Sequence, residues 1–260
     1  MWPFRSKPLL DAETAAWHVE NFAWLLSEFG HGDDFSACKL VLPKPGFFPS
    51  DGERGHAKAL RIFRQTQTYC GMGDWEIDLV ADNNPVARRE APAYVMLQHG
   101  KHALGTYSRR GNRSQITYVP TLLERPEHLI ATFAHELAHD LLSSARTPPP
   151  SEADENEFLT DLTAVFLGFG VFLANARFDF ETSGGGGWSM RRAGYLPEAD
   201  LIFALALFLR TRQIGPDAAM EWLKPHLGKL LRKALGDLPD THADVAALRA
   251  ALADAQKIAS

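Results

Sequence analysis

The sequence predicts an α+β protein in which a small, mainly antiparallel sheet lies between one helical region and a longer one. Three observations carry this prediction. Apolar residues recur at intervals of three and four in the first 70 residues and again after Pro120, as in amphipathic helices. Between these parts, residues 75–119 show alternating and short apolar runs that are typical of strands. The separation of helices from strands along the chain, with no internal repeat, favours α+β architecture.

The N-terminal region is expected to form two helices joined by a long loop. Asp11 can cap a helix that ends at Gly30, because the apolar residues between them follow helical spacing. Residues 31–55 are rich in glycine, proline and aspartate, which predicts a loop with one short extended segment at 39–42. Helical spacing returns over residues 56–69.

The central region is expected to form three or four strands. Residues 75–80 alternate between apolar and polar side chains, and apolar runs follow at 94–98, 103–107 and 115–119. Turn residues separate these runs. The segment 109–113, Arg-Arg-Gly-Asn-Arg, indicates a hairpin between the last two strands.

Helices are expected throughout the rest of the chain. They are predicted at residues 126–144, 151–176, 197–209, 217–235 and 241–257. Pro126 suits a first helical position, and Ser151 with Asp154 has the pattern of a capping box. Gly168 and Gly170 lack side chains inside the second of these helices, so we expect them to allow close helix packing by letting another backbone approach.

These elements suggest three regions along the chain. Residues 1–74 form an N-terminal helical and loop region, residues 75–180 form a core with the sheet and two helices, and residues 181–260 form a helical C-terminal subdomain.

Composition and charge narrow the classes of function. The 260 residues carry a formal net charge of −5, with a pI near 6.1 and only short, interrupted basic stretches. This argues against a nucleic-acid partner.

Cys38 and Cys70 are expected to be buried free thiols, since two cysteines make no disulfide framework in a chain of this size. No apolar segment follows the N-terminal charges, and the least polar stretch, 162–176, is short for a membrane span, which predicts a cytoplasmic protein with no membrane partner.

One motif carries the chemistry: His135-Glu136-Leu-Ala-His139, on the helix after the sheet. Residues four apart share a helix face, so both imidazoles can reach one metal ion at about 2.0–2.1 Å from each nitrogen. Glu136 is displaced around the helix, where its carboxylate can stay off the metal and accept a proton from metal-bound water.

A catalytic zinc ion takes three protein ligands, so a third is needed. Glu157 and Asp161 lie four apart on the next helix and share a face. We expect Glu157 to be the ligand and Asp161 to accept the other N–H of a ligand imidazole. The reverse assignment, with Asp161 on the metal, is the alternative.

The pattern His135-Glu-Leu-Ala-His139 followed by Asn156-Glu157-Phe-Leu-Thr-Asp161 resembles the gluzincin, or thermolysin-like, branch of the HExxH zincin metallopeptidases. The resemblance covers about 75 residues, from the hairpin to Ala176. It implies a zincin-like fold, zinc bound by the two histidines and Glu157, Glu136 as general base, and Asp161 in support of a ligand histidine. It also implies that the hairpin supplies an edge strand for an extended peptide. With 17 residues between His139 and Glu157, the spacing is a little shorter than in thermolysin-like enzymes.

A peptidase also needs a donor for the tetrahedral oxyanion. Tyr195, just ahead of a helix start, is the first candidate and His226 is the second. We therefore expect a zinc metallopeptidase whose substrate is a peptide or protein. A zinc-stabilised, non-catalytic binding or regulatory protein with a zincin fold is the alternative, and the sequence leaves substrate specificity and oligomeric state open.

Overall fold

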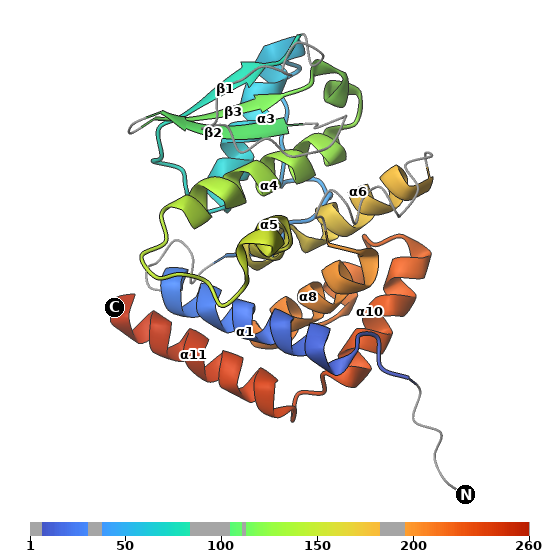
Figure 1. The fold of residues 1–260 in the computed structure, drawn as a ribbon. Coiled ribbons are helices and arrows are strands. Elements are labelled where there is room, and N and C mark those ends of the chain that lie inside the picture. The colour runs from blue at the N-terminus through green and yellow to red at the C-terminus, as the bar shows by residue number, and fades with distance from the viewer. Residues whose placement is uncertain (1–6, 31–37, 84–104, 111–112, 183–195, 260) are drawn as a thin grey trace, which may run out of the picture.

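Helix α4 (Pro126–Ser143) lies between a small sheet and a group of helices, so that it contacts both halves of the molecule (Figure 1). The structure, a computed structural model, describes residues 7–30, 38–83, 105–110, 113–182 and 196–259. Its mixed composition of helices with one small sheet confirms the predicted α+β class.

The described sheet has three strands. They are β1 (Ile77–Ala81), β2 (Gly105–Arg110) and β3 (Arg113–Tyr118), in the spatial order β1-β3-β2. The predicted hairpin is confirmed, because β2 pairs antiparallel with β3, with Tyr107 opposite Ile116. The prediction of a mainly antiparallel sheet is wrong for the described strands, since β1 pairs with β3 in parallel. Periodicity locates a strand but carries no information on its direction. The predicted run 94–98 lies outside the described residues.

The N-terminal helices form close to where the sequence predicts them. Helix α1 (Ala12–Phe29) is capped by Asp11, whose carboxylate accepts from the Thr14 N–H at 2.8 Å. Helix α3 (Gly55–Tyr69) packs against α4. Residues 39–42 form no strand; the Val41 N–H instead donates to the Gly168 carbonyl at 3.0 Å. Their apolar character reflects burial in the core, which propensity alone does not separate from a strand.

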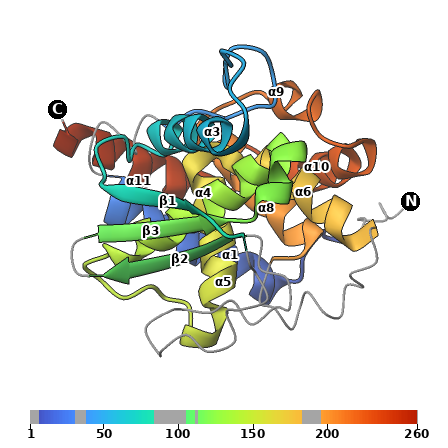
Figure 2. The same cartoon turned by 90° about the horizontal axis from the view of Figure 1, so that it is seen from above.

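The long helix predicted over residues 151–176 is broken. The short helix η3 (Ala153–Glu155) leads into α5 (Asn156–Ala164), the π-helical segment η4 (Val165–Phe169) and α6 (Gly170–Thr182). Gly168 has φ +98°, and a Cβ there would lie 2.0 Å from the Lys39 carbonyl oxygen. The close approach of another backbone predicted for Gly168 is therefore confirmed, but this backbone belongs to the non-helical segment 39–42 and not to a helix. The chain bends here, so that α5 and α6 run in different directions (Figure 2).

The capping box of this segment lies one residue later than predicted. Glu152 and Glu155 exchange the two capping hydrogen bonds, rather than Ser151 and Asp154. The glutamate side chain of Glu152 makes the hydrogen bond that Ser or Thr makes in the usual capping box. The pattern that begins with Ser151 therefore predicts the capping box one residue too early.

The C-terminal part is helical, as predicted. It comprises α8 (Glu198–Thr211), α9 (Asp217–Met220), α10 (Pro225–Asp237) and α11 (Ala243–Ala259). The predicted single helix over 217–235 is two helices, because Pro225 begins a new one at its first position. Helices α1 and α11 pack together, and α8 is buried beneath them (Figure 1).

One continuous hydrophobic core joins residues from Phe22 to Leu252. Cys38 and Cys70 are buried within it and form no disulfide, as predicted. The segment Ala153–Arg177 has the length and apolar composition of a membrane span, but 89% of its most apolar window is buried inside the fold. Its apolar residues thus serve the core around α4.

Candidate metal centre

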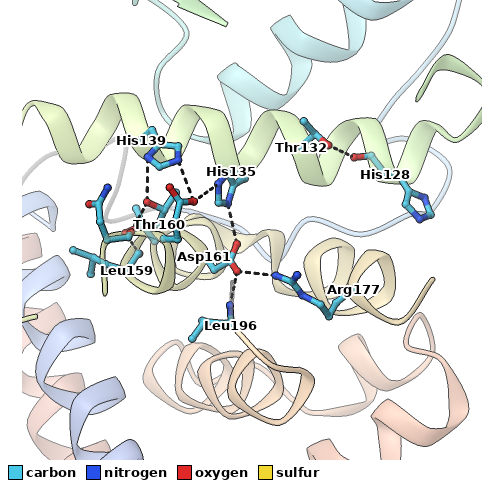
Figure 3. A network of polar contacts seen from close by, with 12 residues as sticks. His128, Thr132, His135, His139, Leu159, Thr160, Asp161, Arg177 and Leu196 are labelled. Carbon is cyan, nitrogen blue, oxygen red and sulfur yellow. Dashed lines mark hydrogen bonds and ion pairs between the residues drawn. The ribbon is translucent and has the colours of Figure 1, made fainter. Parts of the chain in front are cut away.

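Helix α4 presents two neighbouring rows of polar side chains. His135 and His139 form one row, which faces α5 (Figure 3). Glu136 and Asp140 form the other, which faces the sheet: Asp140 Oδ1 accepts from Tyr107 of β2 at 2.9 Å and from Ser114 of β3 at 2.7 Å. Each residue of an α-helix is turned by about 100° from the last, so the two rows point in different directions, although Tyr107 of β2 reaches both, since its ring also stacks on His139 with the centroids 6.2 Å apart.

The His row meets Glu157 of α5 at a single point. His135 Nε2 lies 3.3 Å from Glu157 Oε2, and His139 Nε2 lies 3.6 Å from the same oxygen. All three candidate ligand atoms lie within 4.8 Å of one another. Tetrahedral zinc with ligands at 2.0–2.1 Å would separate neighbouring ligand atoms by about 3.3–3.4 Å. The two His–Glu distances are close to this value, so the group could hold a metal ion such as zinc. No second cluster of this kind occurs in the described ranges.

Asp161 lies on the far side of His135 from this cluster. A carboxylate accepts, so His135 Nδ1–H donates to Asp161 Oδ1 at 2.9 Å. Asp161 Oδ2 in turn accepts from Arg177 Nη2 at 3.0 Å and from the Leu196 backbone N–H at 2.9 Å. These contacts, drawn in Figure 3, keep a proton on Nδ1 and turn Nε2 toward Glu157, so that Nε2 is the nitrogen that a metal ion can take. The geometry thus favours the predicted assignment, in which Glu157 belongs to the cluster and Asp161 accepts the hydrogen bond from the other nitrogen of His135.

Thr160 holds His139 in the same way, and the sequence reasoning missed it. Its hydroxyl donates to the Asn156 carbonyl at 2.8 Å and therefore accepts from His139 Nδ1 at 3.2 Å. The available signal was its position: Thr160 precedes Asp161 and lies one turn after Asn156 on the helix that carries Glu157. Both imidazoles are thereby oriented with Nε2 toward one point.

The electrostatics of the metal-free cluster reflect this convergence. Burial lowers the pKa of His135, but hydrogen bonds to Asp161 and Glu157 outweigh burial and raise it to about 10. Burial alone would raise the pKa of Glu157, yet hydrogen bonds from His135 and His139 hold it well below its ordinary value. Glu157 is therefore an anion at neutral pH, the form in which a carboxylate ligates a metal.

Glu136 lies next to the cluster but on the row facing β2. It is 1% exposed, and its charge contributes to the raised pKa of His135. A Cβ placed at Gly105, the first residue of β2, would lie 2.9 Å from Glu136 Oε1. The carboxylate is therefore close to the candidate ligands without being one of them, which is the placement that a general base requires.

Of the two candidate oxyanion donors, His226 lies in the described part of the chain. Tyr195 lies outside the described residues. His226 Nε2 lies 3.4 Å from Glu198 Oε1 at the first turn of α8, so His226 pairs with an acidic side chain of that helix.

Comparison with known proteins identifies no relative. No family model matches the chain, and neither a curated protein nor a solved structure matches it significantly. The case for a function therefore depends on the geometry and chemistry of the site.

Proposed function

We propose that this protein is a zinc-dependent metallopeptidase in which Glu136 is the general base. The observation that carries the proposal is the convergence of His135 Nε2, His139 Nε2 and Glu157 Oε2 beside a buried carboxylate that is not part of the cluster. Two imidazoles with one carboxylate form a ligand set of zinc peptidases, which keep a fourth position open. The sequence resemblance to gluzincins supports the same reading.

The residues around the cluster can divide the work of peptide hydrolysis. Zinc, when bound, would supply a Lewis acid that acidifies water and polarises the peptide carbonyl. Glu136 would accept the proton that water loses as its oxygen bonds to the carbonyl carbon. Glu136 would then deliver that proton to the amide nitrogen as the C–N bond breaks. Asp161 and Thr160 would keep the two imidazoles in the ligating tautomer throughout.

Strand β2 supports a peptide as the substrate class. Among the described strands it stands at one end of the sheet order, and its first residue lies against Glu136. An extended peptide can add to such a strand through backbone hydrogen bonds. Added there, a peptide would run past the general base.

The test combines metal analysis with cleavage. The purified full chain is analysed for bound metal, then incubated with a library of unstructured peptides, and new termini are identified by mass spectrometry. Glu136→Gln should retain zinc and lower kcat by about 10²–10⁴-fold, the usual contribution of a general base. Glu127→Gln, an exposed change in the first turn of α4, is the matched control and should cleave normally. Equal cleavage by Glu136→Gln would refute the mechanism, and absence of bound zinc after reconstitution would refute the function.

The second candidate is a zinc-stabilised binding or regulatory protein without turnover. The observation that favours it is the low exposure of the cluster: the His135, His139 and Glu157 side chains are 8%, 5% and 20% exposed. Low exposure limits the access of a substrate to the cluster, and a structural zinc site stabilises the fold without binding a substrate. Bound zinc that raises the melting temperature, with no cleavage of any library peptide, would decide for this candidate.

A further inference from the structure

Strand β2 lies along helix α4 in a matched register. Gly105 lies beside Glu136, the Tyr107 hydroxyl donates to Asp140 at 2.9 Å, and Arg109 Nη1 donates to Ser143 Oγ at 3.1 Å. Alternate strand residues are about 6.6–6.8 Å apart, and the helix partners, which are four and then three residues apart, rise about 6 Å and about 4.5 Å. The long Arg109 side chain spans the difference at the second step. The strand is thus fixed to the row of α4 that carries Glu136.

At the Gly105 end of this register there is no room for a side chain. A Cβ on Gly105 would lie 2.6 Å from Thr132 Cγ2, 2.9 Å from Glu136 Oε1 and 3.1 Å from the Thr117 carbonyl oxygen. The backbone of Gly105 is not in the left-handed region, so alanine there would bring no backbone strain. Glycine is needed at position 105 only because a side chain would not fit between β2 and α4.

The three neighbours of Gly105 differ in how far they can yield. The Thr117 oxygen belongs to the backbone of β3, and the Thr132 hydroxyl donates to the His128 carbonyl at 2.9 Å, which holds its methyl group in place (Figure 3). The Glu136 carboxylate is the end of a flexible side chain. A side chain at Gly105 would therefore displace two parts of the structure: the strand β2 where it packs on α4, and the Glu136 carboxylate.

We propose that Gly105 is a positioning residue for the general base: by lacking a side chain, it leaves the space in which the Glu136 carboxylate lies beside β2. This inference rests on the proposed function for its effect on rate. Its structural content, that Gly105 sets the position of the carboxylate, stands apart from any activity.

The test is Gly105→Ala, with zinc content, KM and kcat measured separately. Zinc should bind as in the wild type, because no ligand lies beside Gly105. KM should be little changed, while kcat should fall by about 10²-fold, the cost of misplacing a reacting group by about 1 Å. Gly228→Ala in α10, where a Cβ meets nothing within 4 Å, is the matched glycine control and should leave kcat unchanged.

A second-site change separates positioning from simple destabilisation. Thr132→Ser removes the methyl group at 2.6 Å but keeps the hydroxyl that binds His128. In the Gly105→Ala/Thr132→Ser double variant, the melting temperature should return toward that of the wild type while kcat stays low. If kcat recovers together with stability, Gly105 has only a structural role and the inference is wrong.

Crystal structures of the wild type and the double variant give the readout that needs no activity. The inference predicts that the Glu136 carboxylate moves while the backbone of α4 and the positions of His135 and His139 stay the same. An unmoved carboxylate overturns the inference whatever the rates. A moved carboxylate in a protein whose wild type binds zinc but cleaves nothing would support the inference and refute the proposed function.

Discussion

Replacing Asp161 by asparagine should weaken zinc binding without touching a ligand. The Asp161 carboxylate accepts three hydrogen bonds, from His135 Nδ1, Arg177 Nη2 and the Leu196 backbone N–H. An asparagine side chain has a single acceptor oxygen. If that oxygen faces His135, the new NH₂ group meets the two donors of Arg177 and Leu196. If the amide turns over, its NH₂ faces Nδ1 and favours the tautomer with a proton on Nε2, where zinc should bind.

The magnitude follows from this conflict. Loss of a hydrogen-bond partner behind a ligating histidine typically costs 10–100-fold in metal affinity, or about 1.4–2.7 kcal/mol. Asp161→Asn also leaves the buried Arg177 guanidinium without its carboxylate, which should destabilise the fold by about 3 kcal/mol. We therefore expect a zinc Kd raised by about 10–100-fold, together with a lower melting temperature.

Competition with a chelating dye of known zinc affinity measures the change, at a temperature where every variant is folded by circular dichroism. Asp200→Asn is the matched control. Asp200 also accepts from a buried histidine, His18 at 3.1 Å, but that pair joins α1 to α8 and not to the candidate ligands. Asp200→Asn should therefore lower stability and leave the zinc Kd unchanged. Equal zinc affinity in wild type and Asp161→Asn would refute the role assigned to Asp161.

Three further predictions concern stability and pH. Gly168→Ala should lower the free energy of unfolding by about 3 kcal/mol in urea titrations, since left-handed backbone costs about 1–2 kcal/mol and a Cβ would lie 2.0 Å from the Lys39 carbonyl oxygen; a loss below 1 kcal/mol would contradict this. In the metal-free protein, stability from His135 is complete below its ordinary pKa of 6.5 and is lost as pH rises toward about 10. The pKa of Glu157 is lowered, so the stability that this residue contributes is present above its ordinary pKa of 4.5 and is lost at lower pH. The melting temperature of the metal-free protein should therefore be highest between pH 4.5 and 6.5. Zinc must displace the His135 proton, so the apparent affinity should rise about tenfold per pH unit from pH 6 to 8, and a flat profile would show that no proton is released.

The parts of the fold that the sequence predicted are those set by local chemistry. Asp11 caps α1 through its own side chain, and Pro126 starts α4 because its fixed φ suits a first helical turn. The break in the long apolar helix was not predicted. It depends on the Lys39 backbone lying against Gly168, a contact between residues far apart in the sequence. Apolar spacing continues across such a break and gives no sign of it.

The same distinction applies to the candidate site. The three candidate ligands could be proposed from the sequence. Helical spacing puts His135 and His139 on the same face of one helix, and the next helix supplies the carboxylate of Glu157. Arg177 could not be proposed in this way. It lies 16 residues after Asp161, which on a straight helix is about 24 Å along the axis. The bend at Gly168 brings its guanidinium to 3.0 Å from the carboxylate.

The two rows of α4 explain why the site is assembled from both sides of one helix. Because adjacent residues are turned by about 100°, His135 and Glu136 lie in different rows, and the residues nearest to each come from different elements. The ligand row is completed by α5, which supplies Glu157 and the groups behind the histidines, and the base row is completed by β2, which lies against Glu136 at Gly105. Metal affinity and turnover should therefore respond to different sets of changes. Combining Asp161→Asn with Gly105→Ala should therefore show the loss in zinc affinity of the first together with the loss in kcat of the second.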